Sequence, residues 1–300
     1  MTENLISIIT PVYKAGSYIR ETFESVLAQT YASWEWIMID DHSPDDTVDV
    51  IRGVFSGNGF VAADDTNGSN SIDTRSGSEE NDPGRDIGYI TEIYVKEPDT
   101  EGVGIGNRIS LLRLKRNAGA ANARNTGLLQ AKGRYIAFLD ADDVWLPDHL
   151  KTCMDHMKEK DAGFVFTAYE FGDENAKGTG RIVHVPEQLR YKEALSRTVI
   201  FTSTTLFDRE RIPDELLNMP AVPSEDTATW WQILRVGHTA YGTDVVTVIY
   251  RRPAGGSLSS NKLVAIKRIW NLYRQVEGLS VVASAWYFAG WAYRATVRRL

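Results

Sequence analysis

The chain has 300 residues, of which 43% are hydrophobic and 24% are charged, so it is long enough to bury a substantial core. These fractions exclude a wholly disordered, a collagen-like or a disulfide-stapled protein, and the single cysteine, Cys153, suits a reducing compartment. The net charge of −7 is concentrated in residues 56–108, which argues against nucleic acid as a partner. No leader-like segment precedes the first apolar run, so we expect a cytoplasmic protein.

The first half of the chain alternates strand-like with helix-like segments. Short apolar runs that end at turn-forming residues predict buried strands, and apolar residues recurring every three or four positions predict helices. The predicted strands are residues 7–10, 34–39, 109–114 and 135–139. The predicted helices are residues 17–29 (with Ser17 as the cap), 46–55 and 120–131, and a helix entered at Pro147. Repeated units of this kind predict an α/β fold, with a mostly parallel sheet and helices on both faces.

The rest of the chain departs from this rhythm in two places. Residues 57–106 are acidic and rich in small polar residues, which predicts a solvated insertion, with a short edge strand or hairpin at 89–95. After residue 160 the strand-like segments alternate with polar residues and predict a mixed sheet, followed by a helix at 227–236 and a strand at 244–250. We expect one domain over residues 1–255 and an amphipathic helical region over 256–300.

Polar residues follow all four predicted parallel strands, where an open sheet of this kind binds its ligands. They are residues 11–13, 40–43, 117–124 and 140–143. In an extended stretch Asp140 and Asp142 point to the same side while Asp143 diverges, and such carboxylates suit Mg²⁺ or Mn²⁺ held together with phosphates. The alternative is an Asp-rich turn that caps the helix after Pro147.

Taken in order, five segments resemble the inverting nucleotide-sugar glycosyltransferases of family 2. The segments are SIITPVYKAGS, WIMIDDHSPDDT, RNAGAANARNTG, YIAFLDADDVW (with a DXD motif) and SEDTATWW. The resemblance implies a GT-A fold and transfer of a sugar from a nucleotide-diphosphate sugar, expected to be UDP-linked, to an acceptor hydroxyl with inversion. It implies Mn²⁺ or Mg²⁺ as the cofactor, and a glycan or lipid-linked acceptor in cell-surface polysaccharide assembly. The acidic insertion is absent from the usual pattern of the family.

The same resemblance assigns roles to individual residues. The donor nucleotide would be bound by Pro11, Tyr13, Asp41, Asn117, Arg124 and Asp140, with Asp41 accepting from the imide N–H of the base. The metal would be held by Asp142, Asp140 and Asp143. The catalytic residues would be Asp226 as the general base and Glu225 as its substitute or as an acceptor-orienting group. The alternatives are a helix cap for Asp41, a solvated surface role for Arg124, and first-turn residues favoured by the helix dipole for Glu225 and Asp226.

Other polar groups carry less specific expectations. Residues 202–205 are expected to border the donor sugar, and Arg251 and Arg252 to hold the diphosphate or an acceptor phosphate. The absence of a Gln-x-x-Arg-Trp motif disfavours a processive polymer synthase. A sugar nucleotidyltransferase and a non-catalytic sugar-nucleotide-binding protein remain as rival functions. His149, Cys153 and His156 share one helical face with metal-capable side chains, but a flank half-buried beside the core explains them more simply.

The C-terminal segment predicts contact with a surface. Residues 278–293 are uncharged but fewer than the roughly 17–25 that span a bilayer, and they are rich in aromatic residues next to arginines. We therefore expect peripheral membrane contact through residues 278–300, on the inner face of the cell membrane. The alternative is a helix packed on the protein's own core or on a second subunit, and the sequence leaves open whether the chain forms a homodimer.

Overall fold

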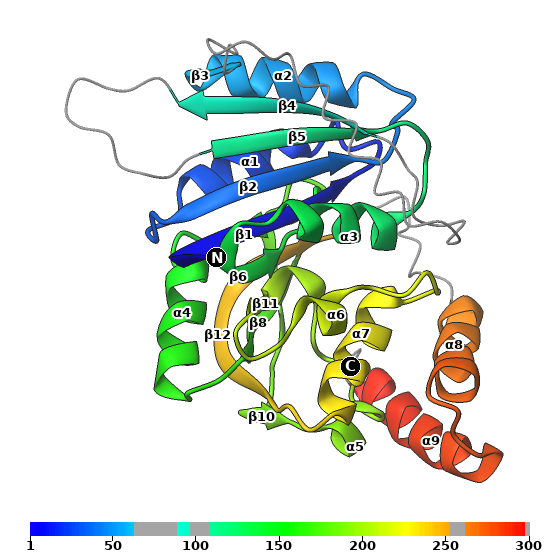
Figure 1. Cartoon of the computed structure of the whole chain (residues 1–300). Helices are drawn as coiled ribbons and strands as arrows, with labels where there is room; N and C mark the ends of the chain where they lie inside the picture. Colours follow the sequence, from blue (N-terminus) through cyan, green and yellow to red (C-terminus); the bar gives the residue numbers. More distant parts are fainter. Residues whose placement is uncertain (63–88, 97–107, 253–261, 298–300) are drawn as a thin grey trace. The chain divides into compact units, whose positions relative to one another are not determined.

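The computed structural model describes residues 1–62, 89–96, 108–252 and 262–297 (Figure 1). Within these ranges the chain forms two compact units, Met1–Asp142 and Asp143–Leu300. Most of the predicted insertion, residues 63–88 and 97–107, lies outside the described residues.

The first unit is built around parallel strands. They lie in the order β6 (Gly133–Phe138), β1 (Thr2–Val12), β2 (Trp34–Asp40) and β5 (Arg108–Leu114). The helices between them are α1 (Ile19–Leu27), α2 (Thr47–Gly57) and α3 (Ala120–Gln130). The four predicted strands and three predicted helices of this half are confirmed. Because the chain leaves β1 toward β2 and later returns to the other side of β1 as β6, the sheet has its topological switch point between β1 and β6.

Helices cover both faces of this sheet, as side-chain alternation along β2 requires. Trp36 points to one face and stacks on Phe23 of α1, with ring centroids 5.6 Å apart. Ile39 points to the other face, where α3 approaches so closely that a Cβ on Gly127 would lie 2.7 Å from Ile39 Cδ1 and 2.5 Å from Ile9 Cγ2. Only glycine fits at this position, and the close packing holds α3 against the sheet.

The structure differs from the sequence prediction at β4, at β3 and at the cap of α1. The sequence predicts a short edge strand or a hairpin at 89–95, and strand β4 (Tyr89–Lys96) pairs antiparallel with β5 on one side and with β3 (Phe60–Ala62) on the other. Strand β3 was not predicted, because three residues are too few to show an alternating pattern. The cap of α1 is also different, since Tyr18 and not Ser17 stands at the N-cap position.

The second unit contains the mixed sheet that the alternation after residue 160 predicted. Its strands lie in the order β10 (Gln188–Leu189), β12 (Ala240–Arg251), β8 (Phe164–Gly172) and β11 (Thr205–Asp208), with β12 parallel to β8 and the other pairs antiparallel. Strand β7 (Val144–Trp145) pairs with β12, and β9 (Gly178–Val183) pairs with β8. The helices are α4 (His149–Glu159), α5 (Tyr191–Ala194), α6 (Asp214–Leu217) and α7 (Glu225–Arg235), with a short 3₁₀ turn η1 (Thr202–Thr204). Phe164, Phe207 and Trp230 stack in its core.

The C-terminal helical region packs on this second unit. It consists of α8 (Lys262–Asn271), a π-helical turn η2 (Leu272–Val276) and α9 (Val281–Val297), in orange and red in Figure 1. Tyr273 of η2 stacks on Trp231 of α7 at 5.3 Å, and its hydroxyl donates to the carbonyl of Leu195. The Glu277 carboxylate, 1% exposed, accepts hydrogen bonds from the Tyr191 hydroxyl and, at 3.2 Å, from the Arg235 guanidinium. Residues 273–277 are therefore anchored to the core of the second unit.

Candidate active site

The carboxyl ends of the four parallel strands gather the donor-site candidates of the first unit. At the end of β1, Pro11 is half-buried and the Tyr13 side chain is 47% exposed. Two bonds tie this loop to the one after β2: the Lys14 backbone N–H donates to Ser43 Oγ at 3.1 Å, and that of Gly16 donates to Thr47 Oγ1 at 3.1 Å. Tyr13, whose ring is accessible, therefore lies on a loop that is hydrogen-bonded to the segment after β2.

Asp41, directly after β2, fastens the loop that leads into α3. It is 3% exposed, and its two oxygens accept the backbone N–H groups of Ala118 and Gly119, each at 2.7 Å. Asn117 adds a hydrogen bond from its side-chain amide to the Asp41 carbonyl at 3.0 Å. Burial raises the pKa of the Asp41 carboxyl above its ordinary value, although these two amides oppose the shift. Asp41 and Asn117, both predicted to bind the donor nucleotide, are therefore brought together.

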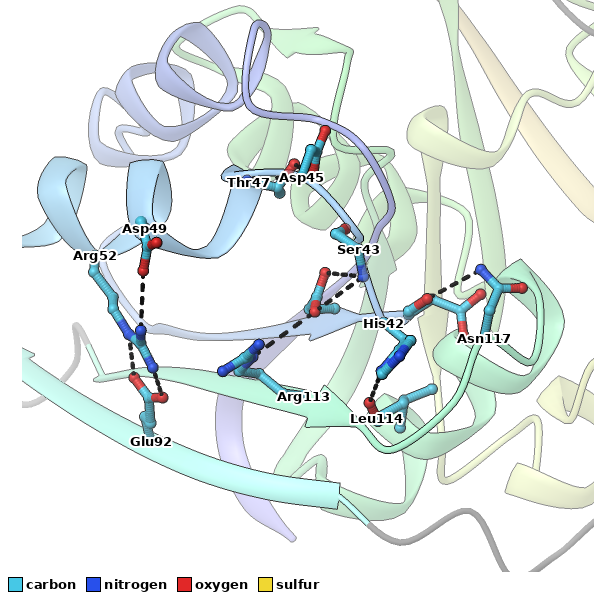
Figure 2. A network of polar contacts seen from close by, with 12 residues as sticks. His42, Ser43, Asp45, Thr47, Asp49, Arg52, Glu92, Arg113, Leu114 and Asn117 are labelled. Atoms are coloured by element: carbon cyan, nitrogen blue, oxygen red, sulfur yellow. Dashed lines mark hydrogen bonds and ion pairs between the residues drawn. The ribbon is translucent and has the colours of Figure 1, made fainter.

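The 40–43 turn after β2 is held by further contacts, and Figure 2 shows His42, Ser43 and Arg113 around it. The Asp40 carboxylate accepts the Ser43 backbone N–H at 3.2 Å and lies 3.9 Å from Arg113 of β5. His42 adopts a left-handed backbone conformation (φ 59°), and its ring lies 3.2 Å from the Leu114 carbonyl. These contacts clamp the 40–43 turn between β2 and β5, which fixes the direction of Asp41.

Arg124 and Asp140 form an ion pair at the end of β6. The Arg124 guanidinium, whose side chain is only 6% exposed, donates to Asp140 Oδ1 at 2.6 Å. Asp142 is half-buried two residues further on, and Thr22 of α1 fixes the turn between them by donating to the Ala141 carbonyl at 2.9 Å. Arg124 is thus buried and paired, which the surface alternative did not anticipate, and Asp140 and Asp142 lie on a rigid turn.

Asp143 lies in the second unit and is completely buried. One of its oxygens accepts the Ser203 hydroxyl at 2.6 Å, and the other accepts the Arg251 backbone N–H at 3.2 Å. Its carboxylate joins η1 to the end of β12. Both of its oxygens therefore take part in contacts within the second unit.

The predicted acidic pair opens helix α7. Glu225 and Asp226 are half-buried in the first turn, after Ser224 in a left-handed conformation (φ 64°). Asp226 Oδ1 accepts the Thr227 backbone N–H at 2.6 Å, and Oδ2 accepts the Thr202 hydroxyl at 3.3 Å. Both carboxylates lie at the helix N-terminus, whose partial positive charge attracts anionic groups. Thr202 was expected to border the donor sugar, and nothing in the sequence links it to Asp226, which stands 24 positions away.

Known proteins resemble this chain over most of its length. The family model described as Glycosyl transferase family 2 matches residues 7–67 and 100–211. The chain belongs to glycosyltransferase family 2. It is 34% identical over 99% of its length to a Bacillus subtilis protein named as a teichuronic acid biosynthesis glycosyltransferase, TuaG, 98% of which is covered. It is 30% identical over 91% of its length to the Escherichia coli UDP-Glc:alpha-D-GlcNAc-diphosphoundecaprenol beta-1,3-glucosyltransferase WfgD, 86% of which is covered.

Solved structures show that this family 2 glycosyltransferase has the GT-A fold. The S. aureus TarS fragment 1–349 in complex with UDP-GlcNAc has a TM-score of 0.60 at 15% identity, over 96% of this chain and 71% of that one. The Pyrobaculum calidifontis mannosyltransferase PcManGT in complex with GDP-Man and Mn²⁺ has a TM-score of 0.60 at 16% identity, over 96% and 73%.

Two further sets of candidate residues in this glycosyltransferase are the arginine pair 251–252 and the histidine and cysteine face of α4. Arg251 is 2% exposed and donates to the Glu174 carbonyl at 2.7 Å, whereas Arg252 lies over the Phe171 ring at 5.1 Å. His149 stacks on Trp145 at 4.4 Å, and its Nδ1 lies 2.8 Å from Thr247 Oγ1. Burial lowers the pKa of His149 to about 3 and raises the pKa of Cys153. The histidine and cysteine face of α4 therefore belongs to the core and is buried more deeply than the half-buried flank of the simpler explanation.

Within the described part of the chain, no helix combines the length and the apolar character needed to cross a membrane.

Proposed function

We propose that this enzyme transfers a sugar from a UDP-sugar to an acceptor hydroxyl in a single, inverting displacement. The observation that supports it is the shared edge of the parallel sheet in the first unit, which carries Tyr13, Asp41, Asp140 and Asp142 next to the switch point between β1 and β6. Solved structures of this fold that hold UDP-GlcNAc, or GDP-Man with Mn²⁺, support a nucleotide-sugar donor.

The donor side of this proposal rests on aromatic and carboxylate groups. The exposed face of Tyr13 suits packing against a base, and each Asp41 oxygen keeps a second lone pair for the imide N–H of uracil. We assign Asn117 and Pro11 to the walls of the same nucleotide site. Arg124 acts through Asp140, which it holds at 2.6 Å.

Asp140 and Asp142 form a donor set that suits a hard divalent ion. They offer only carboxylate oxygens, and no group of three or more metal-capable side chains converges among the described residues. One or two carboxylates completed by substrate phosphates is the set that Mg²⁺ and Mn²⁺ prefer. We therefore assign Asp140 and Asp142, without Asp143, to a site for Mn²⁺ or Mg²⁺. When bound there, the ion neutralises charge on the diphosphate.

On the acceptor side, Asp226 takes the proton. The acceptor oxygen forms a bond to the anomeric carbon while the bond from that carbon to the diphosphate breaks, and the electron pair leaves with the diphosphate. The hydroxyl proton passes to Asp226, whose position is set by the amide of Thr227 and the hydroxyl of Thr202. One base and no covalent intermediate give inversion. Glu225, one residue earlier, is assigned to orient the acceptor.

The acceptor is proposed to be a lipid-linked glycosyl diphosphate used in cell-surface polysaccharide assembly. The names of the B. subtilis and E. coli relatives support this class of acceptor. Residues 1–255 would form the transferase domain, and residues 278–300 would contact the membrane surface from the cytoplasmic side. On α9, Val282 is 80%, Trp286 is 77% and Tyr293 is 72% exposed, which suits the interface of a bilayer.

The test is sugar transfer by the purified chain. UDP-sugars with Mn²⁺ and an alkyl-linked glycosyl diphosphate are expected to give a product of inverted anomeric configuration. Asp226→Asn is expected to lower kcat by about 10²- to 10⁴-fold while UDP binding is retained. Gln232→Glu, further along the same helix and half-buried, is the control for a charge change on α7. Near-normal turnover of Asp226→Asn, or full activity with a chelator present, would contradict the assigned base or the assigned metal.

A further inference from the structure

Two adjacent cavities lie along α9 in the second unit. Their volumes are about 400 Å³ and about 600 Å³, and both are lined by Ser196, Arg197, Tyr293 and Arg294. The first extends along β9 to His184 and Val199, and the second extends along α5 to Lys192 and Trp286. We refer to these two neighbouring cavities, between α9 and the segment that follows α5, as the α9 groove.

The α9 groove is a fixed feature of the unit. Trp291 Nε1 donates to Thr198 Oγ1 at 3.0 Å. Gly290 faces Ser196 so closely that a Cβ on the glycine would lie 2.9 Å from Ser196 Cβ. Just after η2 and four residues before α9 begins, Glu277 is held by Tyr191 and Arg235. The walls are therefore fastened to the fold on both sides of the space that they enclose.

The chemistry of the groove suits an anion carried on an apolar stem. Its cations are Arg197, Arg294 and Lys192, while the acid in its lining, Glu193, accepts the Arg190 backbone N–H at 3.1 Å as part of the cap of α5. Guanidinium groups bind phosphates with charge-assisted hydrogen bonds.

The aromatic residues of the groove supply the apolar part of such a site. Trp286, Tyr287 and Tyr293 line it, and Trp286 and Tyr293 are mostly exposed. Rings with a polar edge accommodate both an alkyl chain and a neighbouring headgroup.

The groove also lies close to the candidate base along the chain. Val199 lines it, and Thr202, which donates to Asp226, is three residues later. Three residues span at most about 11 Å, so Val199 and Thr202 are no further apart than that. A ligand that occupies the groove at Val199 is thus near enough for a sugar attached to its phosphate to approach Asp226.

We propose that the α9 groove binds the diphosphate and the first part of the lipid chain of the acceptor. This assignment rests on the proposed function, since it names the acceptor subsite of the same reaction. Arg197 and Arg294 hold the diphosphate, the aromatic residues of α9 hold the alkyl chain, and the sugar extends past Val199 toward Asp226.

Binding of dodecyl diphosphate, followed by tryptophan fluorescence with saturating UDP and a chelator present, tests the groove without requiring turnover. The wild-type chain is expected to bind it, and Arg197→Gln and Arg294→Gln are each expected to weaken binding about tenfold or more. Lys267→Gln removes one positive charge from α8 outside the groove and is expected to change binding less than twofold (about 0.4 kcal/mol). If Arg197→Gln does not fold, the same binding measurement is made with Arg294→Gln, at an exposed position, and with Tyr293→Ser.

Three outcomes would overturn the proposal. The first is a wild-type chain that does not bind dodecyl diphosphate. The second is that the arginine variants lose as much affinity for dodecyl glucoside, which lacks the phosphates, as they lose for dodecyl diphosphate. The third is that the arginine variants lose affinity for phosphatidylglycerol vesicles but not for dodecyl diphosphate, which would indicate a membrane surface as the partner of these arginines. Transfer to a phosphate-free acceptor by a chain that fails the first test would leave the transferase activity standing and remove only the groove assignment.

Discussion

The Arg124 guanidinium is buried beneath the turn after β6 and donates to Asp140 Oδ1 at 2.6 Å. A buried guanidinium paired with a half-buried carboxylate fixes the direction of that carboxylate more firmly than solvent does. The arrangement makes Arg124 the positioning residue for one of the two proposed metal ligands.

Arg124→Lys keeps the positive charge and removes the planar guanidinium. We expect the Mn²⁺-dependent affinity for UDP to fall by about tenfold, because groups that orient metal ligands typically affect affinity by about 10- to 100-fold. Titration calorimetry of UDP with and without Mn²⁺ measures the effect. Arg116→Lys, an exposed position two residues beyond β5, is the matched control. An equal loss in both variants would show that Arg124 does not act through Asp140.

Asp142 and Asp143 are neighbours in sequence with different surroundings. We expect substitution of Asp142 to affect activity and substitution of Asp143 to affect stability. Asp142→Asn is expected to abolish transfer and leave the unfolding midpoint unchanged. Asp143→Asn is expected to lower the free energy of unfolding by about 1–3 kcal/mol, because its oxygens accept from Ser203 and Arg251 inside the second unit. Transfer assays and urea denaturation of both variants check this, and the reverse pattern would exchange the roles of the two residues.

The parallel half of the fold was predictable because its strands are short apolar runs and its helices are amphipathic. Strands such as β2, buried along its whole length, and helices such as α1 leave a periodic signal in the sequence. The three residues of β3 leave none. The cap of α1 was also missed, because Ser17 has the preferred side chain but the chain enters the helix one residue later, at Tyr18.

The candidate site was predictable in the residue types it contains and less so in their partners. Motif positions named Asp140, Asp142 and Asp226. The i, i+2 spacing set Asp143 apart from the first two, whereas the family resemblance included it among the metal ligands. The hydroxyl of Thr202 on Asp226 and the amides of Ala118 and Gly119 on Asp41 come from residues distant in sequence. Such contacts depend on tertiary packing, which no local pattern encodes.

Thr202 is expected to act on the rate through Asp226. Thr202→Val keeps the shape of the buried side chain and removes the donor, so we expect kcat to fall about tenfold, in line with the loss of one hydrogen bond to a charged group. The acidic limb of the kcat/KM profile is expected to move to higher pH, because a carboxylate that has lost a donor accepts a proton more readily.

Thr202→Ser, which restores the hydroxyl, is expected to recover most of the rate and the original pH profile. Rates and pH profiles of the three proteins, with UDP affinity as a check on folding, distinguish this role from a purely structural one. Equal losses in the valine and serine variants would point to packing instead.

His149 makes the stability of the second unit depend on pH. Burial lowers its pKa to about 3, whereas in the unfolded chain its pKa is about 6.5. Between these values the unfolded state binds a proton that the folded state does not. The contribution of neutral His149 to the free energy of unfolding is therefore complete above about pH 6.5, and it decreases as the pH falls, by up to about 1.4 kcal/mol per pH unit. His149→Phe preserves the stacking on Trp145 and is expected to flatten this slope in urea denaturation between pH 4 and 6. His238→Gln, in the turn before β12, is expected to keep the wild-type slope, and an unchanged slope in His149→Phe would assign the pH dependence to other groups.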